Sequence, residues 1–231
     1  MDANDHMFED VFETRSTLHV DTAADEPGGG APSNLCATDS LDGFGKVLAK
    51  GKNVLLYFWT PSDELRESIA KTRFSVLPSF SETVAKADLA VLPSKAPDGI
   101  TSRILTELAG VLAAFAELVP TNAVKVDFCK TSARSCPLFH VDRVSFRMLC
   151  TLRGPGTEWL ADGAVNRKRL GQDDNRKVTK QGALVYVVAP FQICVLKGEA
   201  HLGSCGAGAV HRSPAVPDTV DGRWYVRVDA A

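Results

Sequence analysis

The apolar and polar positions divide the chain into a first part with helical periodicity and a second part with the period of β-strands. Apolar residues recur at helical spacing over residues 101–119, and Pro120 ends the pattern. Before it, the apolar run 53–60 predicts a strand. A helix should follow, with Thr60 as its N-cap and Pro61 at its first position.

After residue 120 the period shortens, and short β-rich runs alternate with Gly, Pro, Asn and Asp. The runs are 122–129, 138–152, 182–190, 191–198, 206–212 and 222–229, with a charged loop at 167–180 between two of them. Several short strands without an intervening helical segment are typical of an antiparallel sandwich or jelly roll. The predicted fold class is therefore α+β, with N-terminal helices packed on a double-stranded β-helix of the cupin-like kind.

Composition indicates where the folded domain begins and gives no sign of a nucleic-acid or membrane partner. Residues 1–34 combine acidic residues and alanine with Pro-Gly-rich sequence, which predicts a loosely ordered tail before a single helix-flanked domain over 35–231. With 26 basic and 28 acidic residues, nothing in the net charge of -2 indicates a nucleic-acid or membrane partner. There is no secretory signal pattern, and the apolar run 104–119 is too short to span a bilayer, so we expect a soluble cytoplasmic protein with reduced cysteines.

Two polar residues stand out in the β-rich run 138–152. On a strand, His140 and Asp142 would project from the same face, and a buried carboxylate must be paired or bound to a metal. His211, 71 residues after His140, is the nearest candidate for a third ligand. Two histidines and one carboxylate form the facial triad that holds non-haem Fe(II) and leaves coordination positions open. The alternative is that His140 pairs with Asp142 or with a carbonyl, and that His211 is an unrelated turn residue.

Arginines follow the second histidine. In the run 222–229, Arg223, Tyr225 and Arg227 alternate with apolar residues and so share one face of a strand. If that face is inward, the guanidinium groups require anions, and the distal carboxylate of a dicarboxylate co-substrate would satisfy one of them. Arg147, on the strand predicted for His140, is the next candidate. If the face is solvent, these are surface residues.

A competing metal site uses Cys129, Cys136 and His140, and thiolate ligands would favour zinc. A hydrolase based on Ser213 and His211 is weakly supported, because adjacent residues on a strand point to opposite faces.

Four motifs carry a resemblance to known families. They are Cys-Pro-x-Phe-His-x-Asp at 136–142, Gly-Pro-Gly-Thr-x-Trp at 154–159, Leu-Lys-Gly at 196–198 and His-Arg-Ser-Pro at 211–214. Over about residues 40 to 229 the chain resembles a bacterial domain-of-unknown-function family. The pattern His-x-Asp with a later histidine also resembles the Fe(II)/2-oxoglutarate-dependent oxygenases of the prolyl-hydroxylase type.

These resemblances imply an Fe(II)/2-oxoglutarate-dependent dioxygenase that hydroxylates a small molecule or a protein side chain. The metal would be bound by His140, Asp142 and His211, and the co-substrate by Arg223 or Arg227. The alternative is a non-catalytic metal-binding or zinc-homeostasis protein on the same scaffold. A third possibility is a cupin-like small-molecule-binding module without metal.

Overall fold

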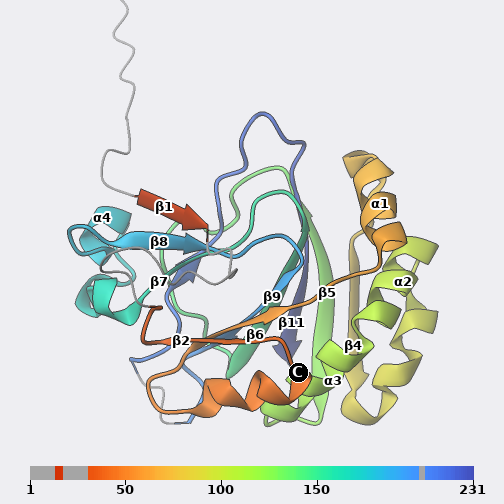
Figure 1. Cartoon of the computed structure of the whole chain (residues 1–231), viewed down its shortest axis with the longest axis horizontal. Helices are drawn as coiled ribbons and strands as arrows, with labels where there is room; N and C mark the ends of the chain where they lie inside the picture. The colour runs from red at the N-terminus through yellow and green to blue at the C-terminus, as the bar shows by residue number, and fades with distance from the viewer. Residues whose placement is uncertain (1–13, 18–30, 203–205) are drawn as a thin grey trace, which may run out of the picture.

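The computed structural model describes residues 14–17, 31–202 and 206–231, and the fold is α+β (Figure 1). The α-helices are α1 Asp63–Lys71, α2 Gly99–Glu107, α3 Ala109–Leu118 and α4 Asn175–Val178. The 3₁₀ helices are η1 Leu41–Leu48, η2 Phe74–Val76, η3 Lys86–Lys95, η4 Asp162–Ala164 and η5 Arg167–Arg169.

Seven strands form the larger of two sheets, in the order β2-β3-β9-β6-β11-β5-β4. Neighbouring strands are antiparallel except for β2 and β3, which run parallel. The strands are β2 Leu35–Thr38, β3 Val54–Phe58, β4 Phe80–Ala85, β5 Ala123–Thr131, β6 Phe146–Arg153, β9 Gln192–Lys197 and β11 Arg223–Ala230.

The smaller sheet has the order β1-β8-β7-β10. Its strands are β1 Thr14–Thr17, β7 Glu158–Leu160, β8 Leu184–Val187 and β10 His211–Arg212. Strand β1 lies within the predicted N-terminal tail and pairs in parallel with β8. The rest of residues 1–30 lies outside the described residues, so the prediction of a loosely ordered tail stays a prediction for them.

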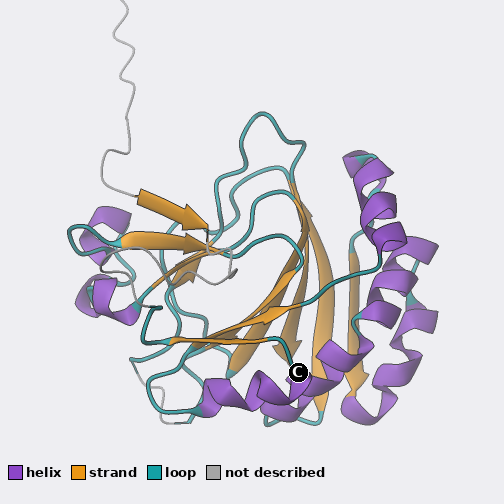
Figure 2. Ribbon diagram, viewed as in Figure 1, coloured by secondary structure: helices purple, strands orange, loops and turns teal. Residues whose placement is uncertain are grey.

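The larger sheet separates two apolar cores. One face packs against α1, α2, α3 and η1, which Figure 2 shows along that sheet. The other face packs against the smaller sheet, and Leu149, Leu196 and Trp159 belong to the cluster between the sheets. On β11, Trp224, Val226 and Val228 contribute to the helix-side core. The predicted alternation along 222–229 is therefore confirmed, and the arginines of β11 lie on the opposite face.

Several element boundaries differ from those predicted. The helix expected over 101–119 is two helices, because the chain bends by 60° between α2 and α3. The N-cap of α1 is Ser62 instead of Thr60, since its hydroxyl accepts the Leu65 N–H. The expectation that no helical segment lies between the strands after residue 120 is wrong, because the short helices η4, η5 and α4 lie between β7 and β8, two of them within the predicted charged loop 167–180. Among the described residues no single helix has the length and apolar composition to cross a bilayer, and only the bent pair α2–α3 together does.

The predicted strand over 138–152 is regular only from Phe146 onward. Before it, the chain bends, and the backbone carbonyls of Asp142 and Ser145 accept the N–H groups of Glu199 and Gly198. Gly198 allows this approach, because a Cβ there would lie 2.0 Å from the Val144 carbonyl oxygen. Asp142 therefore lies in a loop held against the turn after β9.

Candidate metal centre

His140 and His211 are brought together by direct backbone pairing. His140 forms an isolated antiparallel bridge with His211, in which each N–H donates to the other residue's carbonyl at 3.0 Å. The two imidazole rings have centroids 4.5 Å apart. His211 also pairs with Trp159 of β7, whose ring lies in the core between the sheets. Opposite residues of a strand pair project from the same face, so the His211 ring points toward the larger sheet.

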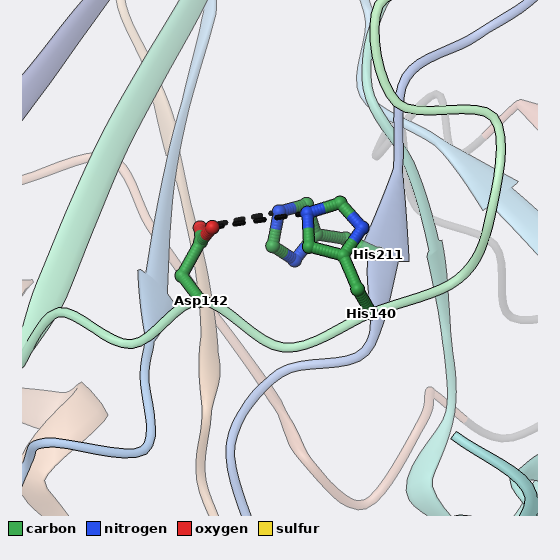
Figure 3. Close-up of side chains that lie close together, drawn as sticks. All are labelled: His140, Asp142 and His211. Atoms are coloured by element: carbon green, nitrogen blue, oxygen red, sulfur yellow. Dashed lines mark ion pairs between the residues drawn. The ribbon is translucent and has the colours of Figure 1, made fainter. Parts of the chain in front are cut away.

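Asp142 completes a group of three ligand atoms. Its Oδ2 lies 3.2 Å from His211 Nε2, and its Oδ1 lies 3.8 Å from His140 Nε2. One ligand atom from each of the three residues falls within 4.8 Å of the others. Figure 3 shows both rings directed at the carboxylate. The structure thus assembles the three residues singled out by sequence, although Asp142 reaches the site from a loop and not from a regular strand.

The other nitrogen of each ring is held by the backbone. His140 Nδ1 lies 2.9 Å from the Leu138 carbonyl oxygen, and His211 Nδ1 lies 3.1 Å from the Ala209 carbonyl oxygen. A carbonyl oxygen only accepts, so Nδ1 carries a proton in both rings, and Nε2 is the ring nitrogen turned toward the carboxylate. This hydrogen bond from the distal nitrogen is the arrangement that fixes metal-binding histidines in orientation and tautomer.

The protonation states also suit metal ligands. Burial by itself would raise the pKa of Asp142, but His211, Arg147 and His140 outweigh it and lower the pKa to about 2. Burial and the adjacent His211 lower the pKa of His140. At neutral pH the carboxylate is ionised and the His140 imidazole is neutral, which are the forms that coordinate a metal.

One buried carboxylate oxygen of the site has few partners among the described residues. Asp142 Oδ2 is fully buried, and it accepts no hydrogen bond there when the His211 proton is on Nδ1 alone, with His211 Nε2 at 3.2 Å. A buried carboxylate oxygen in that state is costly unless a cation occupies the space it faces. The buried oxygen, the two Nε2 atoms and the fixed tautomers fit a divalent metal held by two histidines and one carboxylate.

A cavity of about 130 Å³ opens beside this group. Both histidines line it, and so do all three arginines considered from sequence, Arg147, Arg223 and Arg227. Of the two orientations left open for the β11 arginines, Arg223 has the inward one, since it lines the cavity and is 3% exposed, and the solvent-face alternative is wrong for it.

The three arginines differ in their ionic partners. Arg147 contacts Asp142 at 2.6 Å and Asp229 at 2.7 Å, while Arg227 contacts Asp127 at 2.7 Å. Arg223 instead donates to two threonine hydroxyls, Thr157 at 2.7 Å and Thr151 at 3.2 Å.

Arg223 is a buried cation without a carboxylate partner in the described part of the chain. Its guanidinium stacks on the Tyr225 ring at 4.2 Å, and its Nε has no hydrogen-bond partner. Burial lowers its pKa to about 10, which still leaves it charged at neutral pH. Of the three arginines, Arg223 is the one whose charge an incoming anion would neutralise.

Sequence reasoning missed the threonines that hold this guanidinium. Thr157 belongs to the Gly-Pro-Gly-Thr-x-Trp motif, for which the sequence alone indicated no role at the site. Its role follows from the hydrogen bond that its hydroxyl accepts from Arg223 of β11, which joins residues 66 apart in the chain.

The rival thiol site is not assembled in the described residues. Cys136 lines the cavity, but Cys129 lies on a shallow groove with Ser81 and Asp127. Within 31–202 and 206–231, the one group of three or more metal-ligating residues is His140, Asp142 and His211. Ser213 also lines the cavity, and the hydrogen bonds described for it are those of its backbone, to Cys136 and from Arg134.

The chain belongs to the family described as protein of unknown function DUF1826, whose model matches residues 48–229. Among curated proteins, none has significant sequence similarity to it.

Three solved structures with a similar backbone arrangement have low sequence identity to this chain. A putative oxygenase from Shewanella oneidensis is 14% identical, over 84% of this chain and 88% of that chain, with a TM-score of 0.46. The dioxygenase for auxin oxidation 1 from Arabidopsis thaliana, in complex with 2-oxoglutarate, is 9% identical over 84% and 91%, with a TM-score of 0.45. HygX from Streptomyces hygroscopicus, with nickel and 2-oxoglutarate bound, is 10% identical over 78% and 82%, also at 0.45.

Proposed function

We propose that the chain is a mononuclear non-haem Fe(II)/2-oxoglutarate-dependent oxygenase of the hydroxylase type, on a scaffold of the jelly-roll kind. One observation carries the proposal. Two histidines with fixed tautomers aim their Nε2 atoms at one carboxylate, and the cavity beside them contains a buried, uncompensated guanidinium.

In this proposal His140, Asp142 and His211 hold the metal. When bound, the iron would supply the oxidation of a substrate C–H bond, coupled to decarboxylation of 2-oxoglutarate by O₂. The protein contributes one negative charge and two neutral nitrogens to the divalent ion. Positions on the cavity side stay free for the co-substrate, as the facial arrangement of such triads allows.

Arg223 is the residue we propose for the distal carboxylate of 2-oxoglutarate. Its guanidinium is held in place by Thr151 and Thr157 and by stacking on Tyr225, so little ordering is needed on binding. A charge-assisted bond at a site 3% exposed escapes most of the screening that weakens surface pairs.

The second candidate function is a non-catalytic metal-binding or zinc-homeostasis protein. Two imidazoles and a carboxylate are also a zinc donor set, which is the observation that keeps this candidate. This second candidate gives no role to Arg223, because a protein that only stores or senses metal has no need of a buried anion-binding group. Anion binding in the cavity therefore separates the two candidates.

Calorimetric titration under anaerobic conditions tests the proposal. We expect 2-oxoglutarate to bind the Fe(II)-loaded protein at one site per chain. Pyruvate has the same 2-oxo acid end without the distal carboxylate, so it should bind about thirty-fold more weakly, as the loss of about 2 kcal/mol implies. Consumption of 2-oxoglutarate in air should require Fe(II). Metal binding without any 2-oxoglutarate binding would overturn the oxygenase proposal and favour the second candidate.

A further inference from the structure

Arg147, on β6, lies between two carboxylates. Its Nη1 donates to Asp142 Oδ1 at 2.6 Å, while Nε and Nη2 donate to the two oxygens of Asp229 at 2.7 and 2.8 Å. Arg147 and Asp229 are cross-strand partners on β6 and β11. Burial by itself would lower the pKa of Arg147, but the two carboxylates raise it. These contacts use three of its five N–H donors and pair its charge with two carboxylates.

The contact with Arg147 divides the two oxygens of Asp142 into different roles. Oδ1 accepts a hydrogen bond from the Arg147 guanidinium and lies 3.8 Å from His140 Nε2, whereas Oδ2 faces His211 Nε2 at 3.2 Å. The backbone around Asp142 is a loop, so no strand pairing fixes the direction of this side chain. The shortest side-chain contact that directs it is the ion pair with Arg147, at 2.6 Å.

We propose that Arg147 is a positioning residue, which holds Asp142 so that only Oδ2 is presented to the metal, and that Asp229 positions Arg147 in turn. This inference rests on the metal site proposed above. It also changes the role of Arg147 from the candidate co-substrate ligand considered at first, because its charge is already neutralised within the protein.

Charge balance explains why Asp229 is part of the arrangement. A guanidinium beside a metal ligand would repel a divalent cation, since at about 4 Å two unit charges interact by several kcal/mol even at an effective dielectric constant of about 20. Asp229 cancels that charge with two hydrogen bonds. The set Asp142, Arg147 and Asp229 keeps one net negative charge, and it keeps the geometry that a lone carboxylate in a loop would lack.

The test separates positioning from charge. In the double variant Arg147→Met/Asp229→Asn, one positive and one negative charge are removed together, so the net charge near Asp142 is unchanged. The matched control is Arg167→Met/Asp162→Asn, which removes a similar ion pair, at 2.7 Å, from residues with no described contact to Asp142, Arg147 or Asp229. Co(II) serves as the probe, with affinity measured by calorimetry and ligand geometry by the visible absorption spectrum of the bound ion.

We expect the Arg147/Asp229 variant to bind Co(II) about ten- to a hundred-fold more weakly than the wild type, which is the usual effect of losing a partner of a metal ligand. Its Co(II) spectrum should change, because Oδ1 becomes free to coordinate. The control should keep the affinity and spectrum of the wild type. Arg147→Lys retains one donor to Asp142, so its Co(II) affinity should lie between those of the double variant and the control. It replaces the double variant if circular dichroism shows that the double variant does not fold.

The outcomes distinguish the two levels of the proposal. If the wild type binds no metal, the proposed function fails and this inference fails with it. If the wild type binds Co(II) but the Arg147 variants keep its affinity and spectrum, only the positioning role is overturned. An equal loss in the control would also overturn it, since the effect would then not depend on contact with Asp142.

Discussion

Arg223→Met is expected to affect stability and ligand binding very differently. Arg223 is 3% exposed, and a buried cation that loses a carboxylate partner commonly costs several kcal/mol. Arg223 has no such partner in the described residues. Its pKa is lowered by burial to about 10 from 12.5, which corresponds to a desolvation cost on the order of 3 kcal/mol.

The contacts that Arg223 makes offset this cost. Two hydrogen bonds to threonine hydroxyls and one stacking contact contribute about 1 kcal/mol each. The terms nearly cancel, so Arg223→Met should change the free energy of unfolding, without co-substrate, by no more than about 1 kcal/mol. Its affinity for 2-oxoglutarate should fall about thirty-fold, because a charge-assisted bond of about 2 kcal/mol is lost.

Arg227→Met is the matched comparison. Arg227 is more exposed, but its removal leaves the buried Asp127 without its guanidinium partner. It should therefore cost about 1–3 kcal/mol of stability, more than the change at the deeper Arg223. Urea unfolding followed by circular dichroism measures the two stabilities, and anaerobic calorimetry measures 2-oxoglutarate affinity. The reasoning is refuted if Arg223→Met destabilises the protein by several kcal/mol and leaves 2-oxoglutarate affinity unchanged.

Three further predictions concern the rest of the chain. The double variant Cys129→Ser/Cys136→Ser should retain the metal stoichiometry of the wild type in elemental analysis, and loss of the metal would restore the thiol site. Gly198→Ala should lower the free energy of unfolding by about 1–3 kcal/mol and weaken metal binding, because its Cβ would lie 2.0 Å from a carbonyl oxygen in the loop that carries the carboxylate ligand. Gly163→Ala, with open space around its Cβ, should change stability by no more than about 0.5 kcal/mol, and equal effects at the two glycines would contradict the steric argument. Hydrogen bonds to Asp127 outweigh its burial and lower its pKa, so it stabilises the fold above about pH 4 and loses that contribution as pH falls further; urea unfolding at pH 5 and pH 3 should show a smaller acid loss in Asp127→Asn than in the wild type.

The residues of the candidate site could be predicted from sequence because their chemistry is unusual where they occur. Histidine and aspartate two apart in an apolar run, and arginines alternating with Trp and Val, are costly choices for a buried face. Period-two alternation then indicated correctly which side of β11 carries Arg223 and Arg227. These inferences needed no knowledge of which strands are neighbours.

The features of the site that could not be predicted from sequence depend on contacts between segments that are distant in the chain. The bridge between His140 and His211 joins residues 71 apart, and Asp142 lies in a loop because backbone groups near Gly198 bind there. The division of roles among the arginines follows from the register of β6, β11 and β5, which places Asp229 beside Arg147 and Asp127 beside Arg227. Register is set by long-range pairing and is not readable from a single strand.

The most direct test of the central claim is the metal content of the Fe(II)-loaded protein and of its His140→Ala and His211→Ala variants after anaerobic gel filtration. We expect one metal ion per chain in the wild type and loss of bound metal in each variant, with circular dichroism spectra that stay like that of the wild type. Full occupancy in either variant, or a wild type that retains no metal, would contradict a metal centre built from His140, Asp142 and His211.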